Sequence, residues 1–245
     1  MRGSSDYLTS NRYFSRYRVI IRLLISLTLL VILSGCRHEP SNILETSACD
    51  PPCWRGINPG TSSVNEVIAQ LELMSEVKDF RAGSLYTDGE LDTVTWEFNS
   101  GIAECLGRSS VSEEVVSIIE IYACNAITLG EVVAKFGEPD QVSVIASSFE
   151  IRWLSIGLLY PERGLAVVAI DEGRWPLDKP GRISEDQRVS HIYFFDPGLY
   201  EDLLRRDSFL RVGACEDDIL SSLQPWRGFG EVAFFDMSQS RIYCP

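Results

Sequence analysis

Cysteine is the residue type in this chain with the most chemistry to offer. The 245 residues contain seven cysteines but only two histidines. A thiol forms a disulfide in an oxidising compartment, binds zinc together with histidine, or attacks a substrate as a thiolate when a base lies beside it. The cysteines are Cys36, Cys49, Cys53, Cys105, Cys124, Cys215 and Cys244. The residues that precede the first cysteine set it apart from the other six.

Cys36 follows an apolar segment and two small residues. The segment Leu23 to Leu33 is interrupted by only two hydroxyl residues, and five arginines and one acid precede it. A basic stretch before a short apolar stretch is the layout of a secretory signal peptide. Leu33-Ser34-Gly35-Cys36 resembles the lipobox of bacterial lipoproteins, where a diacylglycerol is attached to the thiol before cleavage. The resemblance implies a signal peptide over residues 1–35 and a lipid anchor on Cys36; a retained signal anchor is the alternative.

The lipid anchor implies that the mature chain is membrane-bound and extracytoplasmic, and this chain is strongly acidic. Residues 1–35 contain five arginines and one aspartate, so their removal leaves 17 basic and 34 acidic residues and a net charge of −17. This charge argues against nucleic acid and anionic lipid surfaces as partners. Hydrophobic residues make up 45% of the chain, which is enough to build a core and excludes a disordered acidic tail.

The six remaining cysteines predict three disulfides, because an even number in an oxidising compartment favours pairing. Nearness in the sequence favours Cys49–Cys53, Cys105–Cys124 and Cys215–Cys244, and the last two pairs more strongly than the first. A zinc site built from Cys49, Cys53 and His38 is the competing hypothesis, but no second closely spaced cysteine pair follows. We therefore expect neither a metal nor another cofactor.

Two helices with the same pattern begin 65 residues apart. Ser63 and Glu66 form a capping box at the start of the first helix, and Thr128 and Glu131 do so at the start of the second. In each helix four apolar residues follow at the spacing of one helical face. These expected core residues are Val64, Val67, Ile68 and Leu71 in the first helix and Leu129, Val132, Val133 and Phe136 in the second.

Strand patterns recur after both helices. Residues 116–122 and 189–195 are matching apolar strands, and alternating apolar residues predict further strands at Val94–Phe98 and Phe149–Trp153. The expected fold is therefore α+β, with two tandem units that each pack a helix or helix pair on a three- to four-stranded antiparallel sheet. The expected boundaries are residues 1–35 for the signal peptide, 36–48 for a tether, 49–125 and 126–196 for the two units, and 197–245 for a C-terminal extension with short helices near 199–206 and 216–223.

Short motifs link this layout to a known family. Pro59-Gly60-Thr61 precedes the first helix and Gly137-Glu138-Pro139 follows the other helix, and both motifs resemble the pattern of BamE-type (SmpA/OmlA) envelope lipoproteins. The tandem layout is similar to that of the β-lactamase inhibitor protein. The resemblance covers residues 54–196, and the first unit departs from it with Glu72-Leu73-Met74 where a Gly-x-Pro exit is expected. It implies a protein-binding or scaffold module of the cell envelope and carries over no functional residue.

Catalytic residue types are sparse. His38 lies in the predicted tether, His191 occupies a strand position whose counterpart is Ile118, and no phosphate loop or hydrolase motif occurs. Carboxylate pairs serve glycoside hydrolysis and calcium binding. With 34 acids in the mature chain, however, adjacent acids are expected by chance, and we interpret them as solvated surface. The acidic clusters are Glu113-Glu114, Asp171-Glu172 and Glu216-Asp217-Asp218. We expect a binding protein and no enzyme; a hydrolase of envelope sugars or peptides is the alternative.

The second unit holds about eight extra residues, because its closing strand is offset by 73 residues while its helix is offset by 65. The turn-rich stretch 171–188 is the natural place for them. It contains Arg174, Trp175 and Arg182, and Trp and Arg are the types enriched at interface hot spots. We take these three residues as the candidates for binding a protein partner. The alternative is an ordinary surface loop with Trp175 folded back onto the sheet.

Overall fold

The computed structural model describes residues 44, 49–83, 93–98, 105–112, 114–123, 127–147, 153–171, 180–204 and 220–236. These residues belong to Ser41–Pro245, one of the two units into which the chain divides. The predicted signal peptide and Cys36 lie outside the described residues, as do Arg174 and Trp175. Within the described part, no helix combines the length and apolarity needed to cross a membrane.

The described elements alternate helices with runs of strands. The first run is α2 (Val64–Leu73), β1 (Val77–Gly83), β2 (Thr93–Phe98), β3 (Leu106–Ser112) and β4 (Val115–Tyr122). The second is α3 (Leu129–Phe136), β5 (Gln141–Ser147), β6 (Trp153–Tyr160), the 3-10 turn η1 (Pro161–Arg163), β7 (Leu165–Asp171), β8 (Gly181–Ile183) and β9 (Val189–Phe195). The chain continues through η2 (Pro197–Leu199), α4 (Tyr200–Leu204), β10 (Leu223–Pro225), β11 (Gly230–Val232) and β12 (Phe235–Asp236).

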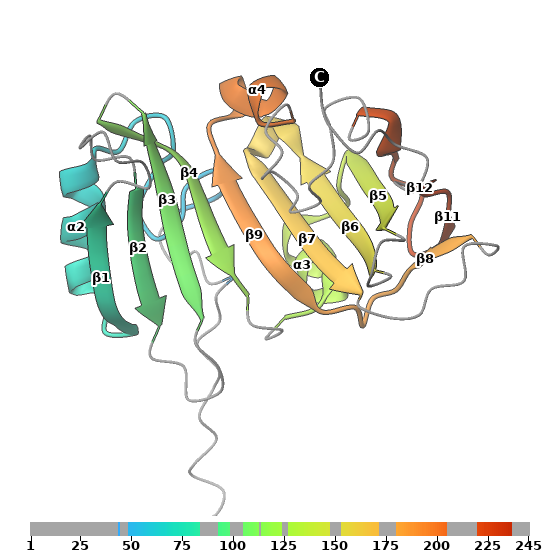
Figure 1. Ribbon diagram of the computed structural model, residues 1–245, viewed down its shortest axis with the longest axis horizontal. Helices are drawn as coiled ribbons and strands as arrows, with labels where there is room; N and C mark the ends of the chain where they lie inside the picture. Colours follow the sequence, from blue (N-terminus) through green and yellow to red (C-terminus); the bar gives the residue numbers. More distant parts are fainter. Residues whose placement is uncertain are drawn as a thin grey trace, which may run out of the picture. The chain divides into compact units, whose positions relative to one another are not determined.

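One sheet of ten strands contains the strands of both runs except β8, in the order β1-β2-β3-β4-β9-β7-β6-β5-β10, with β12 also beside β5 (Figure 1). Its strand pairs are antiparallel apart from β12 with β5. A separate pair is formed by β8 and β11. The expected α+β class is therefore confirmed, although the sheet is continuous where the sequence predicted separate small sheets.

Both predicted helices begin at their capping boxes. The Oγ of Ser63 accepts the Glu66 amide at 3.3 Å, and the Oγ1 of Thr128 accepts the Glu131 amide at the same distance. Each glutamate side chain accepts the amide of its own cap residue at 2.7 Å. Because the cap fixes where the helix starts, it also fixes which side chains face the sheet.

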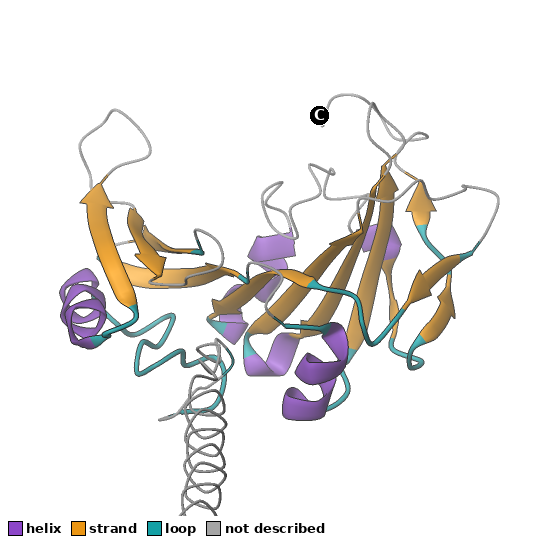
Figure 2. Ribbon diagram, turned by 90° about the horizontal axis from the view of Figure 1, so that it is seen from below, coloured by secondary structure: helices purple, strands orange, loops and turns teal. Residues whose placement is uncertain are grey.

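Two apolar cores lie on opposite faces of the sheet. The larger joins the inward residues of α2 and α3, including the fully buried Val67 and Val132, to alternate residues of the central strands. Figure 2 shows these two helices on one side of the sheet. The smaller core brings Leu203 and Leu204 of α4 against Tyr193 and the other outward residues of β9 and its neighbours. A sheet with apolar side chains on both faces needs cover on both, and α4 supplies it on the second face.

Two expectations for the ends of the folded part need correction. Leu44 lies in the predicted tether but is only 3% exposed and joins the larger core, so part of that segment packs on the fold. The C-terminal extension was expected to hold short helices. It does contain α4 and a helical turn at 220–222, but it also adds β10, β11 and β12. These strands have only two or three residues, too few for a period-2 pattern to be recognised.

Candidate functional site

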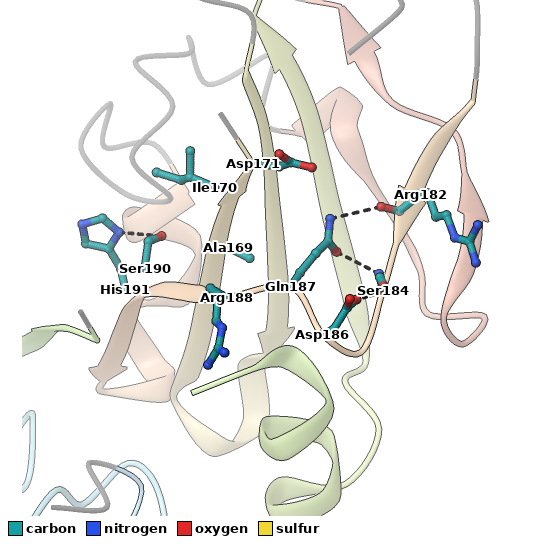
Figure 3. Close-up of a pocket in the computed structure, with 10 residues that line it drawn as sticks. All are labelled: Ala169, Ile170, Asp171, Arg182, Ser184, Asp186, Gln187, Arg188, Ser190 and His191. Atoms are coloured by element: carbon teal, nitrogen blue, oxygen red, sulfur yellow. Dashed lines mark hydrogen bonds between the residues drawn. The ribbon is translucent and has the colours of Figure 1, made fainter. Parts of the chain in front are cut away.

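A cavity of about 860 Å³ lies between the end of β7 and the turn that leads from β8 to β9. Its walls come from Ala169 to Asp171, from the turn after β8 and from the start of β9 (Figure 3). The turn carries most of the polar groups, including Asp186 and Gln187. Concave sites with a few placed polar groups are the default candidates for ligand or partner binding.

The side chain of Gln187 holds this turn together. Its Oε1 accepts the Ser184 amide at 2.8 Å, and its Nε2 donates to the carbonyl of Arg182 at 3.3 Å (Figure 3). The turn is also tied to the start of α3, because the Leu129 amide donates to the Gln187 carbonyl at 3.0 Å. The Gly130 amide donates to the Glu185 carbonyl at 2.9 Å. These hydrogen bonds use the amides that a helix N-terminus leaves without intrahelical partners, so the wall of the cavity is positioned by α3.

The charges around the cavity are mixed. Ser184 donates a hydrogen bond to the exposed carboxylate of Asp186. This bond, then a backbone hydrogen bond and then the positive charges of Arg182 and Arg188 hold the pKa of Asp186 below its ordinary value. The guanidinium groups of Arg182 and Arg188 point away from each other in Figure 3. They therefore do not form the converging pair that binds a phosphate or carboxylate between two arginines. The arrangement of charges is better suited to binding a polar protein surface with positive and negative groups than to binding a small anion.

Ser190 and His191 form a pair at the cavity that resembles a nucleophile beside a base, but its hydrogen bonds run the other way. The Oγ of Ser190 donates to the Val168 carbonyl at 2.9 Å and lies 3.0 Å from His191 Nδ1. A hydroxyl has one proton. Because the hydroxyl donates that proton in its hydrogen bond to the carbonyl, the Ser190 oxygen accepts a hydrogen bond from His191 Nδ1. The histidine is therefore not placed to remove a proton from Ser190. This geometry does not favour the hydrolase hypothesis.

A β-bulge places Ser190 in this position. The register of β7 with β9 passes from Val168–His191 to Ala169–Val189, which leaves Ser190 without an opposite residue. Bulges re-aim side chains and are frequent beside functional sites. Here the bulge lets two neighbouring side chains, Ser190 and His191, both line the cavity.

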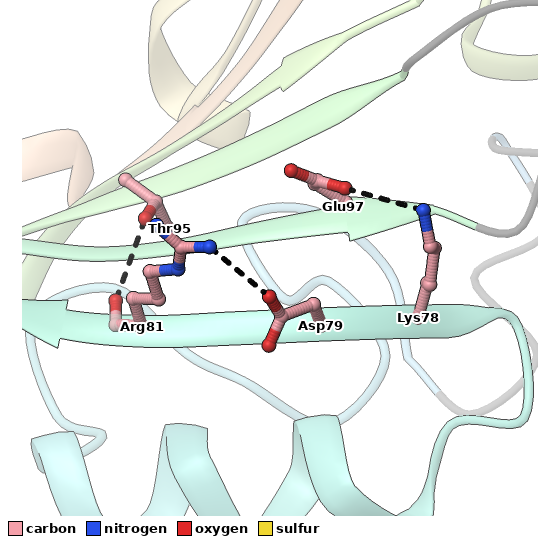
Figure 4. A network of polar contacts seen from close by, with 5 residues as sticks. All are labelled: Lys78, Asp79, Arg81, Thr95 and Glu97. Atoms are coloured by element: carbon pink, nitrogen blue, oxygen red, sulfur yellow. Dashed lines mark hydrogen bonds and ion pairs between the residues drawn. The ribbon is translucent and has the colours of Figure 1, made fainter.

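A second polar surface covers the face of β1 to β4 that lies opposite α2. Arg81 and Asp79 on β1 are 3.5 Å apart, and Lys78 lies 3.9 Å from Glu97 on β2 (Figure 4). These four side chains are between 43% and 80% exposed. Further along the sheet, Arg108 Nη2 on β3 contacts Glu120 Oε2 on β4 at 2.5 Å, and there the carboxylate is only 3% exposed.

The structure describes some of the predicted site residues and not others. Cys49 and Cys53 are joined by a disulfide, which withdraws both thiols from the zinc hypothesis. This was the pair the sequence favoured least. Cys105 is also disulfide-bonded, while Cys124, Cys215 and Cys244 lie outside the described residues. In the part of the chain that is described, no three metal-binding side chains gather to hold an ion.

Arg182 is the one predicted partner-binding residue that is described, and it lies at the cavity. Arg174 and Trp175 fall in 172–179, which connects Asp171 of the cavity wall to the start of β8. Sequence reasoning missed Gln187, the Ser190–His191 pair and the Arg108–Glu120 pair. Of these, only Glu120 left a sign in the sequence, because it interrupts the apolar run of β4.

The chain was compared with known proteins at the level of families, sequences and structures. No family model matches it, and neither does any curated protein or solved structure. The similarity to BamE-type lipoproteins and to the β-lactamase inhibitor protein therefore stays a prediction from short motifs.

Proposed function

We propose that this protein is a lipid-anchored, extracytoplasmic envelope protein built from two tandem α+β units, and that it acts by binding another protein. The observation that carries the binding part is the cavity at the β8–β9 turn. Its turn carries polar groups and is firmly positioned, its lining has charges of both signs, and its Ser–His pair is arranged unlike a nucleophile and base.

The two halves of the sheet share details that support a tandem origin. In each closing strand the bulged residue is a serine, Ser117 in β4 and Ser190 in β9. Each serine donates to the carbonyl of the neighbouring strand's residue beside the bulge, at 3.3 Å to Ser110 and 2.9 Å to Val168. The cap residue of each helix also bridges to the start of the matching closing strand: Ser63 to Val115 and Thr128 to Arg188.

The seam between the halves supports the same proposal. β4 and β9 pair antiparallel with Glu120 opposite Tyr193. These two residues are 73 positions apart, the offset that also relates the bulged serines. A two-fold rotation through this pair therefore exchanges the strands, and it exchanges the flanking pairs Ile118–Phe195 and Tyr122–His191. Two copies of one ancestral unit joined edge to edge would produce this register.

The disulfides support the proposed location. Cys49–Cys53 and the bonded Cys105 belong to the described fold. Disulfides persist in secreted and envelope proteins, whereas the cytosol keeps thiols reduced. Together with the lipobox-like Leu33 to Cys36, they favour a protein exported and held by its lipid.

Replacing Cys36 with Ala is expected to abolish lipid attachment, because the thiol is the acyl acceptor in the lipobox. In cells fed a labelled fatty acid, the Cys36→Ala protein should carry no label and should keep the mass of the precursor. Ser34→Ala is the matched control, because it keeps a small residue before the cysteine, and it should be labelled like the wild type. Label on Cys36→Ala would contradict the anchor.

Replacing Arg182 with Ala is expected to weaken partner binding. Arginine is one of the residue types enriched at binding hot spots, and Arg182 lines the cavity, so its loss is expected to cost about 2 kcal/mol, or roughly thirtyfold in affinity. The partner is first captured by a photo-crosslinking residue placed at position 175, and its affinity for the full chain is then measured. Alanine is chosen because Glu231 lies opposite Arg182 across β8 and β11, where a new acid would repel it.

Arg227→Ala is the control for this experiment, since Arg227 is also an exposed arginine and does not line the cavity. It should bind as the wild type does. Trp175→Ala should weaken binding while leaving the melting temperature nearly unchanged. Equal affinities for Arg182→Ala and Arg227→Ala would place the binding surface elsewhere, and a large loss of stability in Trp175→Ala would assign that residue to the core.

A further inference from the structure

The two ends of the ten-stranded sheet are finished differently. β5 is the fourth strand from the seam in one direction, and its outer edge is covered by β10 at Gln141–Ser143 and by β12 at Ile145–Ala146. β1 is the fourth strand in the other direction. Among the described strands, only β2 pairs with it. An edge of unpaired amides and carbonyls is a template for another strand.

The register of the sheet shows which backbone groups of β1 point outward. Phe98 donates its amide to the Cys105 carbonyl, so Phe98 and every second residue before it on β2 bond to β3. The residues between them bond to β1, and they lie opposite Asp79 and Arg81. In an antiparallel ladder successive residues bond to opposite sides. The amide and carbonyl of Phe80 therefore point away from β2.

The side chains on either side of Phe80 are complementary to the same side chains of a second, antiparallel copy of β1. An antiparallel copy of β1, related by a two-fold axis at Phe80, brings Asp79 opposite Arg81 of the other copy and Arg81 opposite Asp79. These two contacts fall in the non-hydrogen-bonded positions, where opposite side chains approach most closely. Asp79 and Arg81 are 52% and 80% exposed, so both are free to turn from their intrachain contact toward a second chain.

The other face of the strand adds apolar contact. Phe80 is half-buried against the larger core, and pairing of two copies would cover its remaining surface. Leu73, at the end of α2 just before β1, is 79% exposed. An edge with central hydrogen bonds, flanking ion pairs and an apolar face matches the make-up of a small protein interface.

We propose that β1 is a self-association edge, at which a second copy of this chain pairs antiparallel about Phe80 and extends the sheet across the dimer. This goes beyond the proposed function, because it needs neither the cavity nor the lipid. The same charges and the bulge at the start of β1 are also devices by which a monomer protects its edge. The experiment separates the two.

The test is a charge swap measured by sedimentation of the full chain in detergent. Asp79→Arg places arginine opposite arginine, and Arg81→Asp places aspartate opposite aspartate, so each single variant should raise the dimer Kd by about tenfold or more. The double variant Asp79→Arg/Arg81→Asp restores both pairs and should return the Kd to within about threefold of the wild type. High salt should weaken the wild-type dimer, because it screens exposed pairs.

Arg227→Asp is the control, since it changes the charge of an exposed arginine far from β1 in the sheet order. It should leave the dimer Kd unchanged. A wild-type chain that stays monomeric up to about 100 μM, a concentration at which even weak specific pairs associate, would overturn the proposal. Dimers that survive both single substitutions, or that the double variant fails to restore, would overturn it as well.

Discussion

Val67→Asp and Val132→Asp are each expected to lower the free energy of unfolding by about 4 kcal/mol or more, because an unpaired carboxylate in an apolar core is among the most damaging substitutions. Both valines are fully buried and occupy the same inward position of α2 and α3. Since both join one core cluster, damage at either helix should reach the whole sheet. Chemical denaturation followed by circular dichroism measures the loss.

Controls for this pair lie on the outer sides of the same helices. Asn65→Asp in α2 and Ala134→Asp in α3 introduce the same group at exposed positions, where helix propensity and the helix dipole limit the cost to about 1 kcal/mol. If Val67→Asp were tolerated while Val132→Asp was not, the two helices would not be equivalent supports of the sheet. That outcome would count against the tandem arrangement.

The helices were predictable because their information is local. A capping box needs four residues and an amphipathic face needs eight, and both helices begin at the expected caps with the expected residues inward. The closing strands β4 and β9 were found for a similar reason, since their apolar runs are long. Such runs are typical of strands with both faces buried.

The order of the sheet was not predictable in the same way. β4 pairs with β9 across some 70 residues, and the sequence of neither strand indicates which strand it pairs with. β6 and β7 were missed as a hairpin because Leu154 to Tyr160 and Leu165 to Ala169 are buried on both faces, which removes the alternation that identifies a strand. The expected strand at Phe149–Trp153 met only the first residue of β6, and residues 148–152 lie outside the described part.

The cavity depended on contacts that no short pattern contains. Its wall is set by amides of α3 bonding to a turn more than 50 residues later, and by a bulge that is invisible until β7 and β9 are paired. The excess of about eight residues did indicate that something is added between β7 and β9. The residue count located the insertion, but only the tertiary structure showed that part of it forms the wall of a cavity.

The Arg108–Glu120 pair gives the second large effect. Removing the arginine in Arg108→Ala leaves the Glu120 carboxylate, which is 3% exposed, without its salt bridge, and should lower the free energy of unfolding by about 3 kcal/mol. Glu120 lies at the seam opposite Tyr193, so the loss should reach the β4–β9 pairing that joins the halves of the sheet. Thermal unfolding measures it, and a surface pair serves as the matched control, because Lys78→Ala should cost well under 1 kcal/mol.

The double variant Arg108→Met/Glu120→Leu distinguishes two cases. In one, the ion pair adds net stability; in the other, it adds none, but removing only one partner is costly. Well-packed apolar residues often replace a buried ion pair with little loss, because they avoid the desolvation of two charges. We therefore expect the double variant to be more stable than the single variants Arg108→Met and Glu120→Leu would predict by addition, with a coupling of about 1 kcal/mol or more in that mutant cycle. Additive losses would mean that the two side chains act independently. In that case the pairing of β4 with β9 would be stabilised by backbone hydrogen bonds and apolar residues, and the ion pair of Glu120 would not contribute to it.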